Sequence, residues 1–185
     1  MFKKYLLGIS ALVALLTFIP TAKAAEPHYI ITTDATYAPF TFQDKNNDYV
    51  GIEQDTMAAI AKREGFTYTM RPMSYNSAAQ LVSNGQADGI IAGMSITPER
   101  REVYDFSTPY YKTGVAWIVK KNSKIKSLTD LKGQTVALKT GTAASEYGKS
   151  LQSKYGFKIK YFNDTDTMYN DCLLYTSDAA DELDG

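Results

Sequence analysis

The stretch Gly89-Ile-Ile-Ala-Gly-Met-Ser-Ile-Thr-Pro-Glu-Arg100 joins a short apolar run to a polar helix start. The apolar half, from Gly89 to Met94, predicts a buried parallel strand. Thr97 is a good N-cap residue and Pro98 a good first helical residue, so we expect a helix to begin directly after the strand. A strand followed closely by a helix is the repeating unit of an α/β fold.

Arg100 falls in the first turn of that expected helix, where the helix dipole disfavours a positive charge. The position makes chemical sense if the guanidinium and the unpaired helix N–H groups share an anion, because a carboxylate matches a guanidinium with two parallel hydrogen bonds. The alternative is a capped surface helix on which Arg100 and the adjacent Arg101 are both solvated.

Upstream of this stretch, strand patterns and helix patterns alternate. The chain before Gly89 predicts a β-α-β-α-β unit with a hairpin inside it. Its expected elements are a strand His28 to Thr33, a hairpin of Phe40 to Phe42 with Tyr49-Val50, a helix Glu53 to Glu64 stopped by Gly65, a strand from Phe66 to Met70 and a helix Ser77 to Ser83. On the first helix, Met57, Ile60 and Ala61 are expected to face the core.

Downstream, the segment from Phe106 to Val119 has no clean helical period and predicts an extended crossing into a second α/β unit. That unit is expected to hold a short turn at Leu128 to Leu131, strands Thr135 to Leu138 and Lys158 to Phe162, a helix Ala143 to Tyr155 and another from Thr165. We therefore expect a first lobe over 25–112, lacking its C-terminal return, and an incomplete second lobe over 113–171.

The two ends of the sequence are set apart from this pattern. Residues 1–24 carry Lys3 and Lys4, an apolar stretch shorter than the roughly 20 residues of a membrane span, and a small-x-small site ending at Ala24. They predict a cleaved signal peptide, the alternative being a retained anchor, and hence an exported protein, periplasmic or at the cell surface. Residues 172–185 resemble the translation of a transposase adapter used in DNA sequencing, so we interpret them as read-through; the alternative is a native acidic helix end.

Composition excludes several classes of function. The 185 residues hold 20 basic and 20 acidic side chains, so no net charge favours nucleic acid. Cys172 is the one cysteine and His28 the one histidine, which excludes an internal disulfide and leaves no ligand set for a cysteine or histidine metal site. We expect no metal and no cofactor.

Two further loops carry residues suited to a small polar ligand. Lys139-Thr-Gly-Thr142-Ala143 lies between an expected strand and helix, and its N–H groups and hydroxyls suit an anion. It lacks the glycine spacing of a nucleotide loop, so a small carboxylate fits better. Asp34 and Tyr37 follow the first strand, where they offer a polar acceptor beside an aromatic wall, and Tyr75 is placed to supply an opposite wall. Turn formation and core packing are the structural alternatives.

Four motifs together resemble the polar amino acid-binding proteins of ABC importers, the bacterial extracellular solute-binding family 3. They are Gly51-Ile-Glu53-Gln-Asp55, Ala92-Gly93-Met-Ser95-Ile-Thr97-Pro-Glu-Arg100, Asp105-Phe-Ser-Thr-Pro-Tyr-Tyr111 and Leu131-Lys-Gly133-Gln-Thr-Val-Ala137. The resemblance runs from about Tyr29 to Asp171. It implies a periplasmic-binding-protein fold of type II, in which two α/β lobes joined by a two-strand hinge close over one ligand, here with the C-terminal part missing.

The resemblance also implies roles for individual residues. Arg100 would clamp the ligand α-carboxylate with Ser95 and the Thr142-Ala143 loop, and the Gly93 carbonyl would accept an ammonium proton. Tyr37 and Tyr75 would sandwich the ligand side chain, with Asp34 and Lys139 near its polar end. The carboxylate that holds the α-ammonium in this family has no match before residue 172. Glu53 and Asp55 are interpreted as acids favoured by a helix N-terminus and not as a catalytic pair.

These features predict a non-catalytic protein that captures a polar L-amino acid, with glutamine favoured, and delivers it to ABC permease subunits in the membrane. Arginine and lysine remain open as ligands because aromatic walls also suit a cation. The intact gene is expected either to end after the domain or to continue into a fused permease. The alternative functions are a dehydratase-like enzyme on the same scaffold and the ligand-sensing domain of a receptor.

Overall fold

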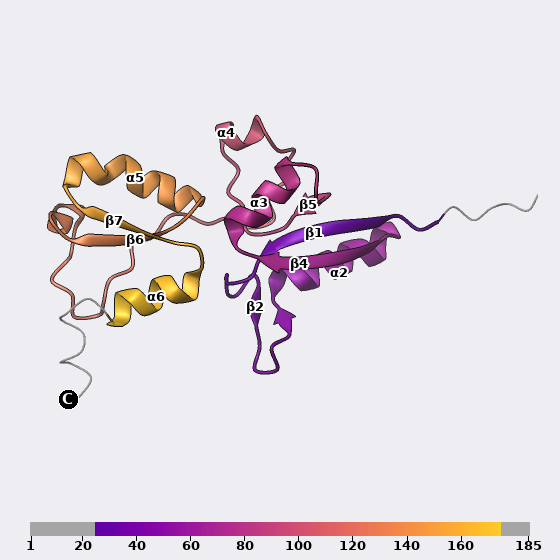
Figure 1. The fold of residues 1–185 in the computed structure, drawn as a ribbon, viewed down its shortest axis with the longest axis horizontal. Helices are drawn as coiled ribbons and strands as arrows, with labels where there is room; N and C mark the ends of the chain where they lie inside the picture. The colour runs from indigo at the N-terminus through magenta and orange to yellow at the C-terminus, as the bar shows by residue number, and fades with distance from the viewer. Residues whose placement is uncertain (1–24, 175–185) are drawn as a thin grey trace, which may run out of the picture.

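The structure is a computed structural model that describes residues 25–174 (Figure 1). The expected signal peptide lies outside the described residues. Of the segment interpreted as adapter read-through, only Cys172 to Leu174 is described, as the end of the last helix. Within residues 25–174, no helix is long and apolar enough to cross a membrane.

The first lobe is built on a three-stranded parallel sheet in the order β4-β1-β5. Strand β1 (His28–Asp34) pairs with β4 (Thr67–Met73) along its whole length, from His28 opposite Thr67 to Asp34 opposite Met73. Strand β5 (Gly89–Ile90) lies on the other side of β1. Because β1 is the central strand, Asp34 at its C-terminal end lies between the ends of the two neighbouring strands.

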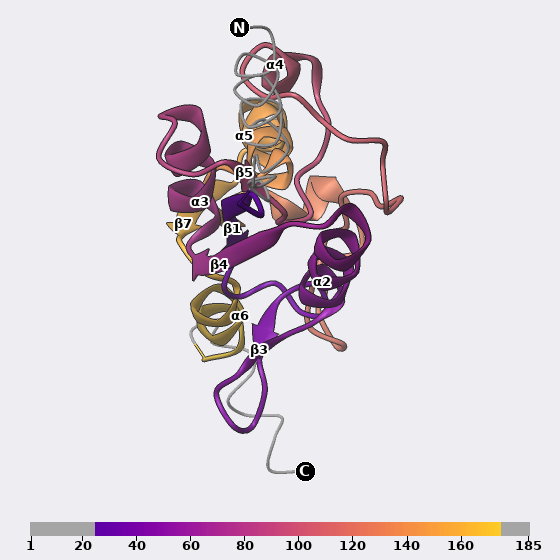
Figure 2. The same ribbon diagram turned by 90° about the vertical axis from the view of Figure 1, so that its right-hand side faces the viewer.

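Two helices cover the opposite faces of this sheet, as Figures 1 and 2 show. Helix α2 (Ile52–Glu64) ends at Gly65, which adopts the left-handed conformation expected of a C-cap glycine. Helix α3 (Tyr75–Ser83) begins after Ser74, whose side chain accepts the Ser77 N–H. Both helices lie within about two residues of the ranges predicted from the sequence.

The buried stripe of α2 differs from the prediction. Glu53, Met57 and Ala61 are buried, at spacings of four residues, while Ile60 is 42% exposed. Residues four apart lie one above the other on a helix, so the stripe begins with a carboxylate instead of an apolar residue. The expectation that Ile60 faces the core is wrong for this reason.

The hairpin consists of β2 (Phe42–Gln43) and β3 (Tyr49–Val50), paired antiparallel as expected. Strand β5 is shorter than the predicted run from Gly89 to Met94, because Gly93 adopts a positive φ of 54° and turns the chain out of the sheet. Helix α4 (Pro98–Arg101) follows, and the Thr97 hydroxyl accepts the Arg100 N–H as its N-cap. The helix start predicted from Thr97 and Pro98 is therefore confirmed.

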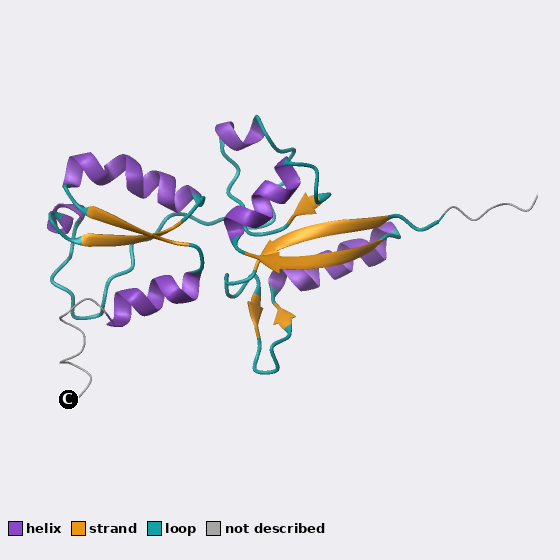
Figure 3. Cartoon of the chain, in the orientation of Figure 1, coloured by secondary structure: helices purple, strands orange, loops and turns teal. Residues whose placement is uncertain are grey.

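The chain then crosses once to the second lobe through an extended segment without strand assignment, residues 104–119. This lobe contains the short helix η1 (Leu128–Leu131), strand β6 (Thr135–Lys139), helix α5 (Ala143–Tyr155), strand β7 (Lys158–Phe162) and helix α6 (Thr165–Leu174). The two strands pair in parallel, and α5 and α6 lie on opposite faces of the pair (Figure 3).

The two lobes bury different kinds of side chain. The second lobe has an apolar cluster of Leu131, Val136, Leu138 and Phe157, against which Trp117 and other side chains pack. The first lobe buries Thr32, Thr33, Asp34, Thr41 and Glu53 together with its apolar residues. A buried polar group is costly unless it is hydrogen-bonded, so these polar residues must be arranged around one another or around a site.

Candidate functional site

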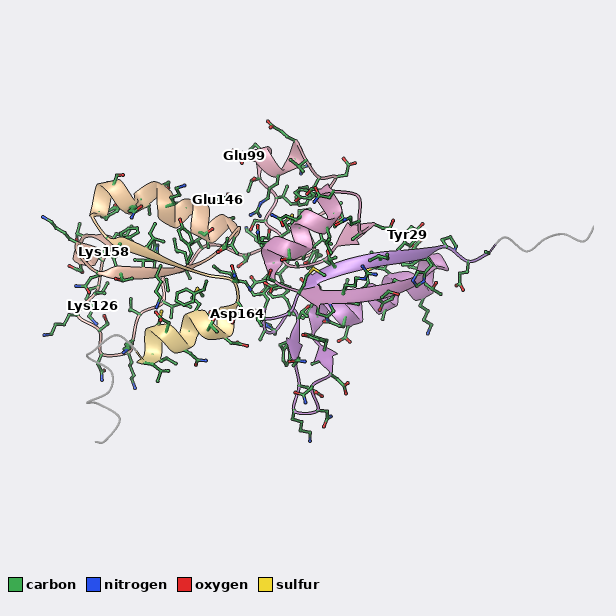
Figure 4. The ribbon with its side chains drawn as sticks, in the orientation of Figure 1. Tyr29, Glu99, Lys126, Glu146, Lys158 and Asp164 are labelled. Atoms are coloured by element: carbon green, nitrogen blue, oxygen red, sulfur yellow. The ribbon has the colours of Figure 1, made fainter. Side chains whose placement is uncertain are left out.

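The ends of four strands meet where the two lobes face each other. Asp34 ends β1, Tyr75 follows β4, Gly93 follows β5, and Lys139 ends β6. Figure 4 shows Glu146 and Asp164 on the side of the second lobe that faces the first lobe, whereas Lys126 and Lys158 lie at the far end. Ligands of open α/β sheets bind outside the carboxyl ends of the strands, so this meeting place is the candidate site.

Lys139 and Asp34 form a buried ion pair between the lobes. The Lys139 Nζ atom lies 2.5 Å from Asp34 Oδ2, and the two side chains are 8% and 4% exposed. The ammonium also donates to the Thr165 hydroxyl at 3.0 Å and to the Thr36 hydroxyl at 3.3 Å. Since the Thr165 N–H donates to the same Thr36 hydroxyl at 3.1 Å, these four residues form one hydrogen-bonded cluster across the lobes.

Arg100 also bridges the lobes, but through backbone carbonyls. Its two terminal nitrogens donate to the Ser95 and Gly141 carbonyls, each at 3.0 Å. The side chain is 11% exposed, and the nearest carboxylate, Glu146, lies 3.9 Å away and is 64% exposed. A guanidinium carries five N–H donors, so further donors are available for an anion. The alternative of a solvated surface arginine is wrong for Arg100, although Arg101 is exposed.

Tyr75 lies beneath the Arg100 guanidinium, which is 5.8 Å from the ring centre. The tyrosine is 5% exposed, and this burial raises the pKa of its hydroxyl to about 12, although the positive charge of Arg100 acts in the opposite direction. Tyr75 is therefore a neutral phenol at physiological pH, and its ring supports Arg100 from below.

Tyr37 contacts two residues near the strand ends, Phe40 and Gly93. Its ring stacks on Phe40, with centroids 4.8 Å apart and an angle of 16° between the planes. Burial raises the pKa of Tyr37, and the charges of Glu53 and Asp34 raise it further. The same ring packs on Gly93, since a Cβ atom added there would lie 2.5 Å from Tyr37 Cε1. Gly93 is thus required both by its positive φ and by the close approach of this ring.

The Thr142-Ala143 loop has the geometry expected of a helix start. The Thr142 hydroxyl caps α5 by accepting the Ser145 N–H at 3.1 Å and donates to the Lys139 carbonyl at 2.9 Å. Ala143 is the first residue of α5. Gly141, just before, has a φ of 76°, and a Cβ atom there would lie 3.0 Å from Asn76 of the first lobe. The loop therefore reaches the opposite lobe.

The structure brings together residues that sequence reasoning missed. Thr36 and Thr165 complete the cluster around Lys139, and Glu53, with no exposed surface, lies behind the site with Tyr110. The i, i+4, i+8 spacing of Glu53 with Met57 and Ala61 is a signal in the sequence that could have identified Glu53 as buried. Nothing local marks the other three residues.

Within the described residues, one cavity and the possible metal ligands can be compared with this site. Across the described range 25–174, no three His, Cys, Asp or Glu side chains are grouped so that they could hold a metal ion. A cavity of about 250 Å3 in the second lobe is lined mainly by Trp117, Val119, Ile125, Leu128 and Leu131. It adjoins the apolar cluster and Lys126 at the far end of that lobe, away from the strand ends (Figure 4).

Two α/β lobes whose strand ends face each other around cationic and aromatic side chains define the class of two-lobe solute-binding proteins with a periplasmic type II fold. Within that class, the chain belongs to the bacterial extracellular solute-binding proteins, family 3, whose family model matches residues 29–176. The fold class predicted from the sequence motifs is confirmed, and so is the exported location, since the family is extracellular.

Individual relatives give the same result. The arginine-binding extracellular protein ArtP of Bacillus subtilis is 36% identical over 166 residues, 85% of this chain and 64% of that protein. The chain thus spans less than two thirds of that relative. Among solved structures, an ancestral arginine-binding protein bound to arginine matches with a TM-score of 0.75 and 36% identity, over 80% of this chain and 66% of the other. An ancestral arginine-binding protein bound to glutamine matches with a TM-score of 0.72 and 34% identity, over 80% and 65%.

Proposed function

We propose that the protein binds a polar L-amino acid between its two lobes, with glutamine as the preferred ligand, and delivers it to ABC permease subunits. One observation carries the proposal: among the described residues, Lys139 and Arg100 are cations that bridge the lobes, and Lys139 is neutralised by a buried carboxylate whereas Arg100 is not. An amino acid with a neutral polar side chain presents its α-carboxylate at one end and an uncharged polar group at the other, which is the complementary pattern for these two cations.

At the Arg100 end, the guanidinium has spare donors directed by two carbonyl contacts and by the Tyr75 ring below. A ligand α-carboxylate there would receive charge-assisted hydrogen bonds, which are about twice as strong as neutral ones. Backbone N–H groups at the start of α5 and the Ser95 loop lie close to the same region because Arg100 contacts the carbonyls of both loops. The ligand ammonium would then face the Gly93 carbonyl.

At the Lys139 end, Asp34 already has a counter-charge at 2.5 Å. The pair offers both a donor and an acceptor with little net charge, which suits the carboxamide of glutamine. A cationic side chain would compete with Lys139 for Asp34, and an anionic one would compete with Asp34 for Lys139. This reasoning favours glutamine over arginine, lysine and glutamate.

Arginine is the second candidate, because relatives that match this chain are named or described as arginine-binding. The stacked Tyr37 and Phe40 rings would also suit a guanidinium. The description of the ancestral protein bound to glutamine shows that one such relative accepts both chemistries. The charge pattern around Asp34 supports glutamine over arginine as the first candidate.

Isothermal titration with glutamine, arginine and glutamate tests the proposal. We expect glutamine to bind at least tenfold more tightly than the others, and Lys139→Met to shift the preference toward arginine because Asp34 then keeps an uncompensated charge. Lys149→Met, the same change at an exposed position of α5, is the control. Tighter binding of arginine by the unaltered protein would contradict the glutamine preference.

Two further measurements separate binding from the alternative functions. Recovery of the amino acid unchanged after prolonged incubation supports a binding protein, whereas its conversion would indicate the dehydratase-like alternative. Loss of radiolabelled glutamine uptake in cells that lack the gene, restored by the intact gene, supports delivery to a permease. Unchanged uptake would argue against that partner.

A further inference from the structure

We propose that Glu53 and Tyr110 are positioning residues for the loop Gly93 to Ser95, and that Tyr110 ties this loop to the segment that crosses between the lobes. The inference rests on the proposed function in one respect, namely that this loop contacts the ligand. Its structural part stands on hydrogen bonds among Glu53, Tyr110 and Gly93.

The contacts form a continuous series of hydrogen bonds from Glu53 through Tyr110 to Gly93. Glu53 Oε2 accepts hydrogen bonds from the Thr33 and Thr41 hydroxyls at 2.9 and 2.8 Å. Glu53 Oε1 accepts from the Tyr110 hydroxyl at 3.1 Å, and that hydroxyl in turn accepts the Gly93 N–H at 3.1 Å. The carboxylate has no exposed surface, so every partner it has comes from the protein.

The donor and acceptor properties of these groups allow only one direction for this series of hydrogen bonds. A carboxylate only accepts hydrogen bonds, so the single Tyr110 proton is used on Glu53 and the oxygen keeps its lone pairs for the Gly93 N–H. Each donor in such a chain is polarised by the next, which strengthens the final contact. Burial and the charge of Glu53 both raise the pKa of Tyr110, which keeps the hydroxyl in the protonated form that the chain requires.

Gly93 is held from two sides. The Tyr37 ring packs against its Cα, where a side chain would clash, and the Tyr110 hydroxyl fixes its N–H. With both contacts in place, the turn at Gly93 directs its own carbonyl and the following Ser95 carbonyl, which receives the Arg100 guanidinium. Glu53 and Tyr110 therefore act on the site through Gly93 and not by touching a ligand.

Tyr110 belongs to the segment that carries the chain from one lobe to the other. Its neighbour Tyr111 packs edge-on against Phe40, with centroids 5.0 Å apart and planes at 89°, so two successive tyrosines attach the segment to the first lobe. A change in the path of this segment during lobe movement would pull on the Gly93 N–H. The hydrogen bond thus couples the crossing segment to the loop.

The matched variants Tyr110→Phe and Tyr111→Phe test the proposal, because each removes one hydroxyl from neighbouring rings. The first readout needs no ligand: amide hydrogen exchange at Gly93, followed by NMR. The second readout is glutamine affinity by titration. For Tyr110→Phe we expect about tenfold faster exchange at Gly93 and about five- to tenfold weaker binding, and for Tyr111→Phe less than a twofold change in both.

Glu53 supplies the second pair of variants. Glu53→Gln keeps an acceptor oxygen for Tyr110 and is expected to retain the exchange protection of Gly93 within about threefold, whereas Glu53→Met is expected to lose it. Equal behaviour of the two variants would overturn the role of Glu53 as an acceptor. Unchanged exchange at Gly93 in Tyr110→Phe, or faster exchange with unchanged affinity, would overturn the positioning role. If the unaltered protein binds no amino acid, the proposed function fails while the exchange measurement still decides the structural part.

Discussion

The two cations that connect the lobes have opposite surroundings. Lys139 reaches from the second lobe into a carboxylate and three oxygens of threonine residues, all within the protein. Arg100 reaches from the first lobe to two carbonyls, and the one carboxylate in reach is exposed and 3.9 Å away. A pair at that distance with one well-exposed partner contributes little, about 0–1 kcal/mol.

The two cations differ in whether their charge is neutralised within the protein. At Lys139 the charge is satisfied internally, so this contact stabilises the association of the lobes. At Arg100 no buried carboxylate neutralises the charge, which is the observation behind the proposal that it binds an anion. Under the proposed function, the neutralised cation at Lys139 meets the uncharged end of the ligand side chain, and the cation at Arg100 meets the ligand carboxylate.

The largest expected effect concerns the buried ion pair of Lys139 and Asp34. Lys139→Met should lower the free energy of unfolding by roughly 3–5 kcal/mol, because it leaves Asp34 buried without its counter-charge. The double variant Asp34→Asn/Lys139→Met removes the orphaned charge and should recover most of that loss. Urea denaturation of the three proteins measures the effect, and equal stability of the single and double variants would contradict it.

The next largest expected effect concerns Arg100, the proposed clamp of the ligand carboxylate. Arg100→Ala should weaken glutamine binding by roughly 2–5 kcal/mol, since a charge-assisted clamp is lost. Calorimetric titration measures this value, with Arg101→Ala as the control because that neighbouring side chain is exposed. A loss of less than about tenfold in affinity, or an equal loss in both variants, would refute the assignment of Arg100 as the carboxylate clamp.

The tyrosine beneath Arg100 predicts a pH dependence. Its folded-state pKa of about 12 is above the value of about 10 for an unfolded tyrosine, so its contribution to stability is complete below pH 10 and is lost as the pH rises through 12. The loss should be on the order of 2–3 kcal/mol. Unfolding free energies measured from pH 9 to 12 should fall more steeply for the unaltered protein than for Tyr75→Phe. Parallel curves would show that Tyr75 does not titrate in this way.

The smallest expected effect concerns the N-terminal cap of helix α5, which lies next to Lys139. The Thr142 hydroxyl caps α5 and also donates to the Lys139 carbonyl. Thr142→Ala should lower the free energy of unfolding by about 1 kcal/mol, whereas Thr142→Ser keeps the hydroxyl and should lose at most a few tenths. Thermal unfolding of both variants provides the measurement; a serine variant as unstable as the alanine variant would exclude the cap as the cause.

Much of the fold could be predicted from local features of the sequence. Gly65 and Gly156 stop their helices in the left-handed conformation, and Thr97 and Thr142 start theirs through hydroxyl caps. Such signals act over a few residues, so they are readable without the rest of the molecule. The predicted strand ends also placed Asp34 and Lys139 among the candidates for the site.

The length of β5 was less predictable. The apolar run continues to Met94, yet the strand ends at Ile90, and Gly93 then turns with a positive φ and meets the Tyr37 ring and the Tyr110 hydroxyl. Both partners come from distant parts of the sequence. The apolar run predicted a buried strand from Gly89 to Met94, but only Ala92 of this run is fully buried and the strand itself is two residues long.

By itself, the sequence determined the order of strands and helices, their caps, and the charged and aromatic residues available at the strand ends. Tertiary structure alone decided that Lys139 pairs with Asp34, 105 residues earlier, and that Glu53 meets Tyr110, 57 residues later. The physical reason is the distance along the sequence over which each kind of interaction acts. Caps and periodicity depend on hydrogen bonds between near neighbours, whereas the charge state of a binding site depends on which distant groups the packed lobes bring within about 3 Å.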